Sequence, residues 1–162
     1  QNIVVDPVMV ATSGARLISA DAIDTLKKQL LPMADILTPN IPEPWSSPVR
    51  RLHPSRTWKS PPEPYLTGTL RRFGKGGHQL SDANDLLCDS DGFHWIRGHR
   101  ILNSNTHGTG CTLSSAIACN LAAGHKLEES VRRAKKYLTG ALEEQLNLGK
   151  GAGPLDHMYR IP

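Results

Sequence analysis

The chain has 162 residues, of which 38% are hydrophobic and 21% are charged, and its formal net charge is +4. This length suits one domain with a buried core, and no run of about 18 apolar residues is present to form a transmembrane helix. Residues 44–73 contain six Lys or Arg residues against one Glu, which leaves the rest of the chain with a net charge of −1. The positive charge belongs to one segment rather than to a face of a folded element, which argues against a nucleic-acid-binding protein.

Three cysteines, Cys88, Cys111 and Cys119, lack the spacing of a zinc site or a redox pair. Their odd number argues against a disulfide framework and favours a reducing compartment, so we expect a cytoplasmic protein. Residues 1–10 include Asp6 and have no basic region before them, unlike a signal peptide. A start at Gln1 rather than Met is consistent with a chain that begins within a longer gene.

The first 39 residues predict a strand, a helix and a second strand. Residues 3–5 and 36–37 are short apolar runs typical of strands buried on both faces. Ser19 is a candidate N-cap, with Asp21 in the first turn of the helix, and Pro32 ends the helix. The apolar positions of this helix, which we expect to face the core, are Ile23, Leu26 and Leu30. Short connections imply a parallel pair of strands with a right-handed crossover.

Residues 44–73 differ in character from the rest of the chain. They hold six of the twelve prolines and two of the three tryptophans, and no apolar period of 2 or 3.6 runs through them. Aromatic residues such as Trp45 and Trp58 are nevertheless unusual in a solvated linker. This composition predicts neither a regular element nor a simple tether.

Regular patterning resumes after this segment. Residues 86–88 and 93–96 predict a β-hairpin around a Gly-containing turn, and residues 101–102 predict a further short strand. A helix should begin near residues 111–112 and end before Gly124, and a last helix should span about residues 127–146. Its expected buried stripe comprises Leu127, Val131, Ala134, Leu138, Ala141 and Leu142. Its expected solvated face carries Arg132, Arg133, Lys135 and Lys136.

The run Gly108-Thr109-Gly110 comes directly before one of these helices. Glycines allow a tight turn that points successive N–H groups at one spot, and the helix dipole adds about half a positive charge there. The sequence therefore predicts an anion site, with a ligand-free glycine turn as the alternative. Cys111 is a candidate base, because a helix start favours the thiolate, or a backbone donor. By itself, however, it is more typical of a small core residue. Neither a Walker P-loop nor a G-x-G-x-x-G fingerprint occurs.

Four blocks occur in order along the chain: Asp6-Pro7-Val8-Met9, Thr38-Pro39-Asn40-Ile41-Pro42-Glu43, Lys75-Gly76-Gly77-His78, and Asn105-Thr106-His107-Gly108-Thr109-Gly110-Cys111-Thr112. This set resembles the hydroxymethylpyrimidine/phosphomethylpyrimidine kinases of thiamine biosynthesis, which belong to the ribokinase-like superfamily. The resemblance covers about residues 1–43 and 74–162. It implies a three-layer α/β ribokinase-like fold with a mostly parallel central sheet and an ATP- and Mg²⁺-dependent phosphotransferase.

The resemblance also implies roles for individual residues. Asn40 and Glu43 would organise Mg²⁺ and the ATP phosphates, and Asp6 would lie near the cation, since carboxylates suit this hard ion. Val8 would face the pyrimidine. The positions implied in nucleotide binding and the anion hole are Lys75, Gly77, Thr106, Gly108, Thr109, Gly110 and Cys111. His107 either touches a phosphate or caps the loop. The other histidines singled out, His78, His94, His99 and His157, are expected to be surface or structural residues.

Sugar kinases of the superfamily have Asp where this sequence has Cys111. The second reaction of the pyrimidine branch phosphorylates a phosphate monoester, which is mostly ionised at neutral pH because its second pKa is about 6. That nucleophile needs little base assistance, so positioning and charge neutralisation can supply the rate. The first reaction, on a free alcohol, needs more help, and the Cys111 thiolate is a candidate for it.

Two features depart from the family pattern. The family's N-terminal portion, which supplies much of the acceptor pocket, is absent. Residues 44–73 also lack the expected helix and apolar strand, and residues 70–74, with Arg71 and Arg72, make a poor central strand. The preserved length suggests a segment read in the wrong frame between two compensating insertions or deletions. The alternatives are a genuine insertion or a Pro-rich partner-binding loop.

Three functional hypotheses follow. The first is phosphorylation of hydroxymethylpyrimidine and its monophosphate; the second is pyridoxal kinase, a close relative with similar motifs; the third is a non-catalytic, truncated remnant. The expected partner is a small-molecule substrate rather than nucleic acid or a membrane, and the family implies a homodimer.

Overall fold

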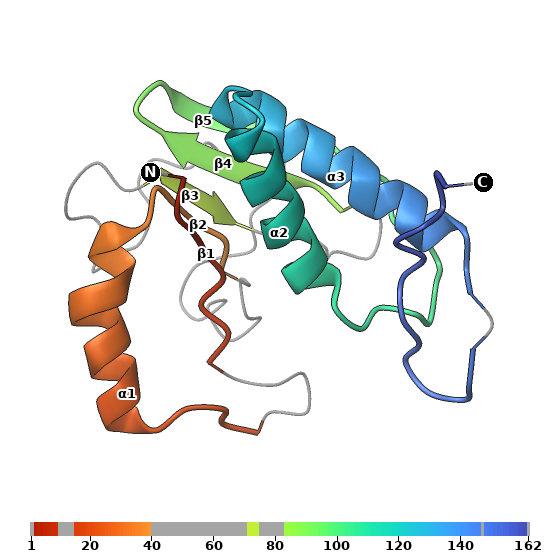
Figure 1. The fold of residues 1–162 in the computed structure, drawn as a ribbon, viewed down its shortest axis with the longest axis horizontal. Coiled ribbons are helices and arrows are strands. Elements are labelled where there is room, and N and C mark those ends of the chain that lie inside the picture. The colour runs from red at the N-terminus through yellow and green to blue at the C-terminus, as the bar shows by residue number, and fades with distance from the viewer. Residues whose placement is uncertain (1, 10–14, 40–70, 75–82, 147, 162) are drawn as a thin grey trace, which may run out of the picture.

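The computed structural model describes residues 2–9, 15–39, 83–146 and 148–161, together with the backbone of residues 71–74. A five-stranded sheet forms its centre, with the strands in chain order (Figure 1). These strands are β1 (Val4–Val5), β2 (Ile36–Leu37), β3 (Arg71–Gly74), β4 (Asp85–Asp89) and β5 (Gly92–Ile96). Each is short, so the sheet depends on the helices packed against it rather than on its own ladders.

The sheet is mixed. β1 pairs with β2, and β2 with β3, in parallel, which confirms the predicted parallel pair of residues 3–5 and 36–37. β3 pairs with β4, and β4 with β5, in antiparallel fashion, and the second of these pairs is the predicted hairpin. The expectation of a mostly parallel sheet is therefore wrong for the described strands, since two of their four pairings are antiparallel. The tight turn at Ser90–Asp91 accounts for the β4–β5 pair, because it permits only an antiparallel return.

The expectation that residues 70–74 make a poor central strand is also wrong. β3 lies in the middle of the sheet, with Arg71 opposite Ile36 of β2 and Phe73 opposite Leu87 of β4. Backbone pairing on both sides holds this strand, and strand propensity yields readily to such context. Residues 44–70 lie outside the described residues, so the reading-frame and insertion hypotheses stay predictions.

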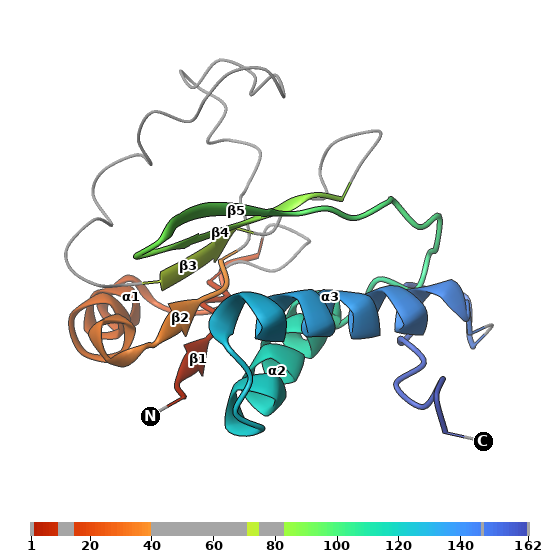
Figure 2. The same ribbon diagram turned by 90° about the horizontal axis from the view of Figure 1, so that it is seen from above.

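A large core lies between the sheet and two helices, α2 (Thr109–Ala122) and α3 (Leu127–Glu143). Its fully or nearly buried members include Ile36, Leu87, Ile96, Leu113, Ile117, Val131 and Leu138. Figure 2 shows α2 and α3 together on one side of the sheet. α2 begins two residues before the predicted start, and Gly124 ends it with a φ of 86°. The predicted buried stripe of α3 is confirmed, with Leu127 and Leu142 partly buried at its ends.

The predicted solvated face of α3 is wrong for one residue, Lys135. Lys135 points back to the sheet, where its ammonium group pairs with the Asp85 carboxylate, which is 2% exposed. Arg132 and Arg133 do face solvent and pair with Glu128 and Glu129 one turn earlier. A lysine can pack its aliphatic stem against the core while its ammonium group reaches a carboxylate at the start of a buried strand. The helical pattern of α3 by itself does not reveal that carboxylate, because it lies on another element.

A smaller core lies on the other face of the sheet, beside α1 (Ala20–Thr25) and the two turns that continue it, η1 (Leu26–Leu30) and η2 (Leu31–Met33). Val5 and Leu37 face this side, because neighbouring residues of a strand point to opposite faces. They pack with Leu31 and Ala34. The predicted stripe is wrong in part, since no residue of α1 is buried and Leu30 is 42% exposed. The winding changes from α-helical to π at Leu26 and to 3₁₀ over Leu31–Met33, which include Pro32, so an ideal 3.6-residue period does not apply.

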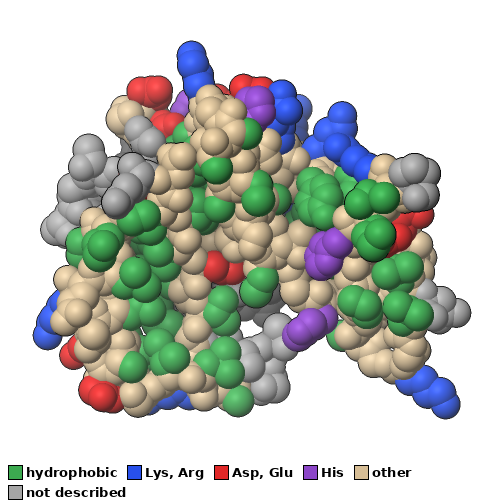
Figure 3. All heavy atoms as spheres, viewed as in Figure 1, with side chains coloured by type: hydrophobic (Ala, Val, Ile, Leu, Met, Phe, Trp, Pro, Cys, Tyr) green, Lys and Arg blue, Asp and Glu red, His purple; other side chains and the backbone are tan. Residues whose placement is uncertain are grey.

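Two further observations complete the fold. The predicted strand at residues 101–102 does not form, and the Leu102 side chain is 84% exposed, so it has no core to pack on. Apolar side chains gather at the surface over α1 and the segment after β1 (Figure 3). Those exposed there include Val8, Leu17, Leu30 and Met33. Within the described ranges, no helix has both the length and the apolar character needed to cross a membrane.

Candidate functional site

The candidate site lies where β1 ends and α2 begins. The Asn2 side-chain amide donates to the Leu121 carbonyl at 3.1 Å, which ties the start of β1 to the end of α2. The helix therefore runs opposite to the strand, and its N-terminus lies towards the carboxyl end of β1 (Figure 1). Asp6 directly follows β1 on this side, and Thr38 directly follows β2. In open α/β sheets, ligands bind at this edge.

The glycine run forms the first turn of α2 as an anion site requires. Gly108 is the N-cap, with φ 80° and ψ 5°, a left-handed conformation that favours glycine. The first helical hydrogen bond runs from the Thr112 N–H to the Gly108 carbonyl at 2.8 Å. The N–H groups of Gly110 and Cys111 precede that ladder and have no helical acceptor. Together with the helix dipole, they offer donors and partial positive charge to an anion.

Cys111 is exposed in the first turn of α2. The interpretation of this cysteine as a small core residue is therefore wrong: the helix turns Leu113, Ser114 and Ile117 to the core instead. Residues 108–111 are called the anion turn below. The Cys111 thiol lies on the outside of this turn, where it is accessible to solvent. Thr106 and His107, on the approach to the turn, are exposed as well.

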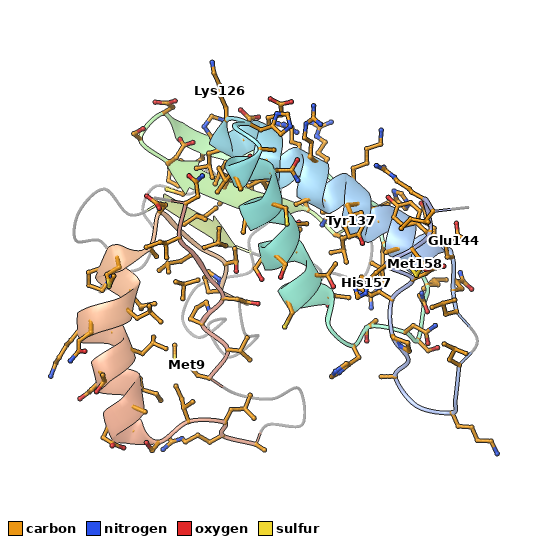
Figure 4. All side chains as sticks on the ribbon, in the orientation of Figure 1. Met9, Lys126, Tyr137, Glu144, His157 and Met158 are labelled. Atoms are coloured by element: carbon orange, nitrogen blue, oxygen red, sulfur yellow. The ribbon has the colours of Figure 1, made fainter. Side chains whose placement is uncertain are left out.

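The base of the loop is anchored by Asn105, a polar residue that is only 6% exposed. Its N–H donates to the Asn103 side-chain oxygen at 2.7 Å, and its side-chain amide donates to the Leu146 carbonyl beyond α3. At the other end of the loop, the Thr112 hydroxyl and His157 Nε2 share a hydrogen bond of 2.9 Å. Figure 4 shows His157 beside the first turn of α2.

Sequence reasoning missed three residues at this site. His157 is exposed, as expected of a surface residue, but nothing in the sequence indicated that it contacts the first turn of α2. Asn105 was noted only as the first letter of its block. Thr38 is fully buried, and its hydroxyl has no hydrogen-bond partner among the described residues. The available signals were the first positions of the T-P-N-x-P-E and N-T-H-G-T-G-C-T blocks, which hold the polar residues Thr38 and Asn105.

Other expected site residues are placed less completely. Asn40, Glu43, Lys75 and Gly77 lie outside the described residues, as does His78. Val8 follows β1 and is 40% exposed. Within the described part of the chain, no group of three or more acidic, His or Cys residues could hold a metal ion. Asp6, directly after β1, carries a carboxylate, which is a type of ligand that Mg²⁺ accepts.

An open groove of about 1010 Å³ continues from the anion turn between α2 and α3. Its lining includes Cys111, Thr112 and the basic side chains of Lys136 and Arg160. Among the described histidines, His94 and His99 hydrogen-bond to Asp89 and Glu143 instead. The arrangement as a whole can hold an anionic group at the start of α2, with positive charge nearby.

A sheet flanked by helices on both faces, with a glycine helix start at the carboxyl end of its strands, defines an α/β protein suited to bind phosphate groups. Known structures narrow this class to ribokinase-like kinases. The pyridoxal kinase from Staphylococcus aureus in complex with ADP matches 99% of this chain and 60% of its own, with a TM-score of 0.77 at 26% identity. The phosphomethylpyrimidine kinase from Clostridium difficile matches 85% of this chain and 56% of its own, with a TM-score of 0.59 at 32% identity.

Sequence comparison identifies the family. Residues 1–156 match the phosphomethylpyrimidine kinase family, and the chain belongs to it. The hydroxymethylpyrimidine/phosphomethylpyrimidine kinase of Streptomyces coelicolor is 42% identical over 98% of this chain, and the thiamine biosynthesis bifunctional protein ThiED of Geobacter sulfurreducens is 44% identical over 96%. The chain spans 59% of the first relative and 32% of the second. The family match runs through residues 44–73, which the four blocks had left outside the resemblance.

Proposed function

We propose that the protein represented by this chain transfers the γ-phosphoryl group of ATP to hydroxymethylpyrimidine and then to its monophosphate, in thiamine biosynthesis. The observation that carries the proposal is the first turn of α2, where the N–H groups of Gly110 and Cys111 have no helical acceptor, in a member of the phosphomethylpyrimidine kinase family. Phosphoryl transfer is catalysed mainly by positioning and charge stabilisation, and such a turn supplies both.

The remaining roles follow the family pattern. Gly108, Thr109 and Gly110, with the N–H of Cys111, would surround the transferred phosphoryl group, and Thr106 would approach it from the preceding loop. Asp6 and Glu43 would hold Mg²⁺, which neutralises phosphate charge when bound. The residues proposed to bind the nucleotide are Asn40, Glu43, Lys75 and Gly77. Val8, partly exposed after β1, would contact the pyrimidine ring.

The two phosphorylation steps place different demands on Cys111. The monophosphate is largely ionised at neutral pH. Phosphoryl transfer to it would therefore depend on the backbone N–H groups, which a side-chain change leaves in place. The alcohol must lose a proton, and the exposed thiol of Cys111 would accept it. We expect Cys111→Ala to slow the first step by about 10²- to 10⁴-fold and the second step far less. Equal rates in variant and parent for both steps would exclude a base role for Cys111.

Pyridoxal phosphorylation is a second candidate, because the pyridoxal kinase of Staphylococcus aureus matches the fold with a higher TM-score than the phosphomethylpyrimidine kinase of Clostridium difficile. A protein that binds nucleotide without catalysing transfer is a third candidate. Calorimetric titration with Mg-ATP, run beside phosphorylation assays on the pyrimidine alcohol, its monophosphate and pyridoxal, separates them. Turnover of the pyrimidines supports the proposal, turnover of pyridoxal alone supports the second candidate, and binding without turnover supports the third.

We also propose a homodimer in the cytoplasm. Free cysteines at positions 88, 111 and 119 suit a reducing compartment. Sedimentation analysis over a range of protein concentrations tests the oligomeric state, and a monomer at the highest concentration would contradict it.

A further inference from the structure

The anion turn is tied at both ends to the chain that follows α3. Asn105 stands before the turn, and its side-chain amide bonds to the Leu146 carbonyl. Thr112 directly follows the turn, and its hydroxyl shares a hydrogen bond with His157 Nε2. The second tie is itself held, because the Tyr137 hydroxyl donates to the His157 carbonyl at 2.8 Å. The segment from 148 to 157 therefore closes a loop around the base of the anion turn.

Asn105 and the backbone of Gly153 approach each other closely within this closure. Gly153 is buried, and a Cβ built on it would lie 2.4 Å from Oδ1 and 2.9 Å from Cγ of Asn105. Its φ is not positive, so the glycine serves close approach rather than backbone conformation. Leu155, two residues after Gly153, is 3% exposed and packs in the main core. This packing holds the backbone of Gly153 against Asn105. The Asn105 side chain is thus held between a backbone surface and a carbonyl.

We propose that the Asn105–Gly153 contact positions the anion turn, so that the segment after α3 sets the direction of the Gly110 and Cys111 N–H groups toward a bound phosphate. The inference rests on the proposed function for its phosphate ligand. Asn105 and Gly153 are positioning residues: they lie behind the turn and act through the two residues, Thr106 and His107, that connect Asn105 to Gly108. Displacing the carboxamide moves the start of that connection, and hydrogen bonds to an anion weaken steeply as donors turn away.

The decisive variant is Gly153→Ala in the full chain, with Gly151→Ala as its matched control. Gly151 lies two residues earlier, is exposed, and has nothing within 4 Å of a built Cβ. Two properties are measured: the amide resonances of residues 106–111 without ligand, and the affinities for Mg-ADP and for adenosine. Gly153→Ala is expected to shift those resonances and to weaken Mg-ADP binding by about ten- to a hundredfold, the loss of one hydrogen bond to a charged group. Adenosine affinity should stay within about twofold, since the nucleoside lacks the group that the turn holds.

A second set of variants keeps the test informative if Gly153→Ala is poorly folded. Asn105→Ala removes the side chain that the new methyl would strike, so adding Gly153→Ala to it should cause little further loss of Mg-ADP affinity. Equal loss of ADP and adenosine affinity would indicate general destabilisation and overturn the proposal, as would unchanged resonances at residues 106–111 or additive losses in the double variant. Failure of the parent chain to bind Mg-ADP would contradict the proposed function alone, because the ligand-free resonances still report on positioning.

Discussion

The ion pair between Lys135 and Asp85 should be a principal link between α3 and the sheet. Asp85 begins β4 and its side chain is 2% exposed, while that of Lys135 is 15% exposed. The lysine ammonium also donates to the Ala83 carbonyl at 2.7 Å. Gly98 makes room for this arrangement, because a Cβ there would lie 2.8 Å from the Lys135 Cε. The pair is thus desolvated and tightly packed.

We expect Lys135→Met to reduce the free energy of unfolding by about 3–5 kcal/mol, since it leaves a buried carboxylate without this counter-charge. That loss is a large share of the roughly 5–15 kcal/mol typical of a domain. Urea denaturation followed by circular dichroism measures it. With an m-value of about 2 kcal/mol/M, the midpoint should fall by about 1.5–2.5 M.

Lys136→Met is the matched control, because the neighbouring lysine is exposed and its replacement should change stability by no more than about 0.5 kcal/mol. Adding Asp85→Leu to Lys135→Met should recover part of the loss, since an apolar pair of similar volume avoids the buried charge. The reasoning is refuted if Lys135→Met costs no more than Lys136→Met, for the carboxylate would then tolerate the loss of its lysine.

Three further predictions concern single positions. Gly108→Ala should cost about 1–2 kcal/mol because its φ is 80°, and should also weaken Mg-ATP binding; a stability and affinity equal to the parent's would argue against the left-handed cap. Ile117→Ala, at a side chain with no exposure, should lower the free energy of unfolding by about 2–5 kcal/mol in the same urea assay, and a loss below 1 kcal/mol, roughly that of Ile→Val, would contradict its place in the core. The hydrogen bond from the Ser19 hydroxyl is the main cause that holds the pKa of Asp21 below its ordinary value, and backbone N–H groups contribute less. A lowered folded-state pKa stabilises above the unfolded-state pKa, and this contribution is lost as the pH falls through the folded-state pKa. Ser19→Ala should therefore raise the Asp21 pKa in an NMR titration, and an unchanged midpoint would exclude the hydrogen bond as its cause.

Local patterns anticipated much of the fold. Short-range periodicity in the sequence predicted three features: the hairpin of β4 and β5, the parallel pair of β1 and β2, and the buried stripe of α3. β3 was misjudged because its pairing comes from two strands distant in sequence. The α1 stripe was misjudged because the helix changes its winding at Leu26, and an ideal 3.6-residue period cannot show that.

The sequence by itself determined the anion turn, since Gly108-Thr109-Gly110 before a helix carries its chemistry in the backbone and needs only local conformation. It also determined the family, through four ordered blocks. Only the tertiary structure decided that Cys111 faces outward, that Lys135 turns to Asp85, and that the turn is held from behind by the segment after α3. These outcomes depend on which distant residues share a space, and packing rather than spacing along the chain sets that.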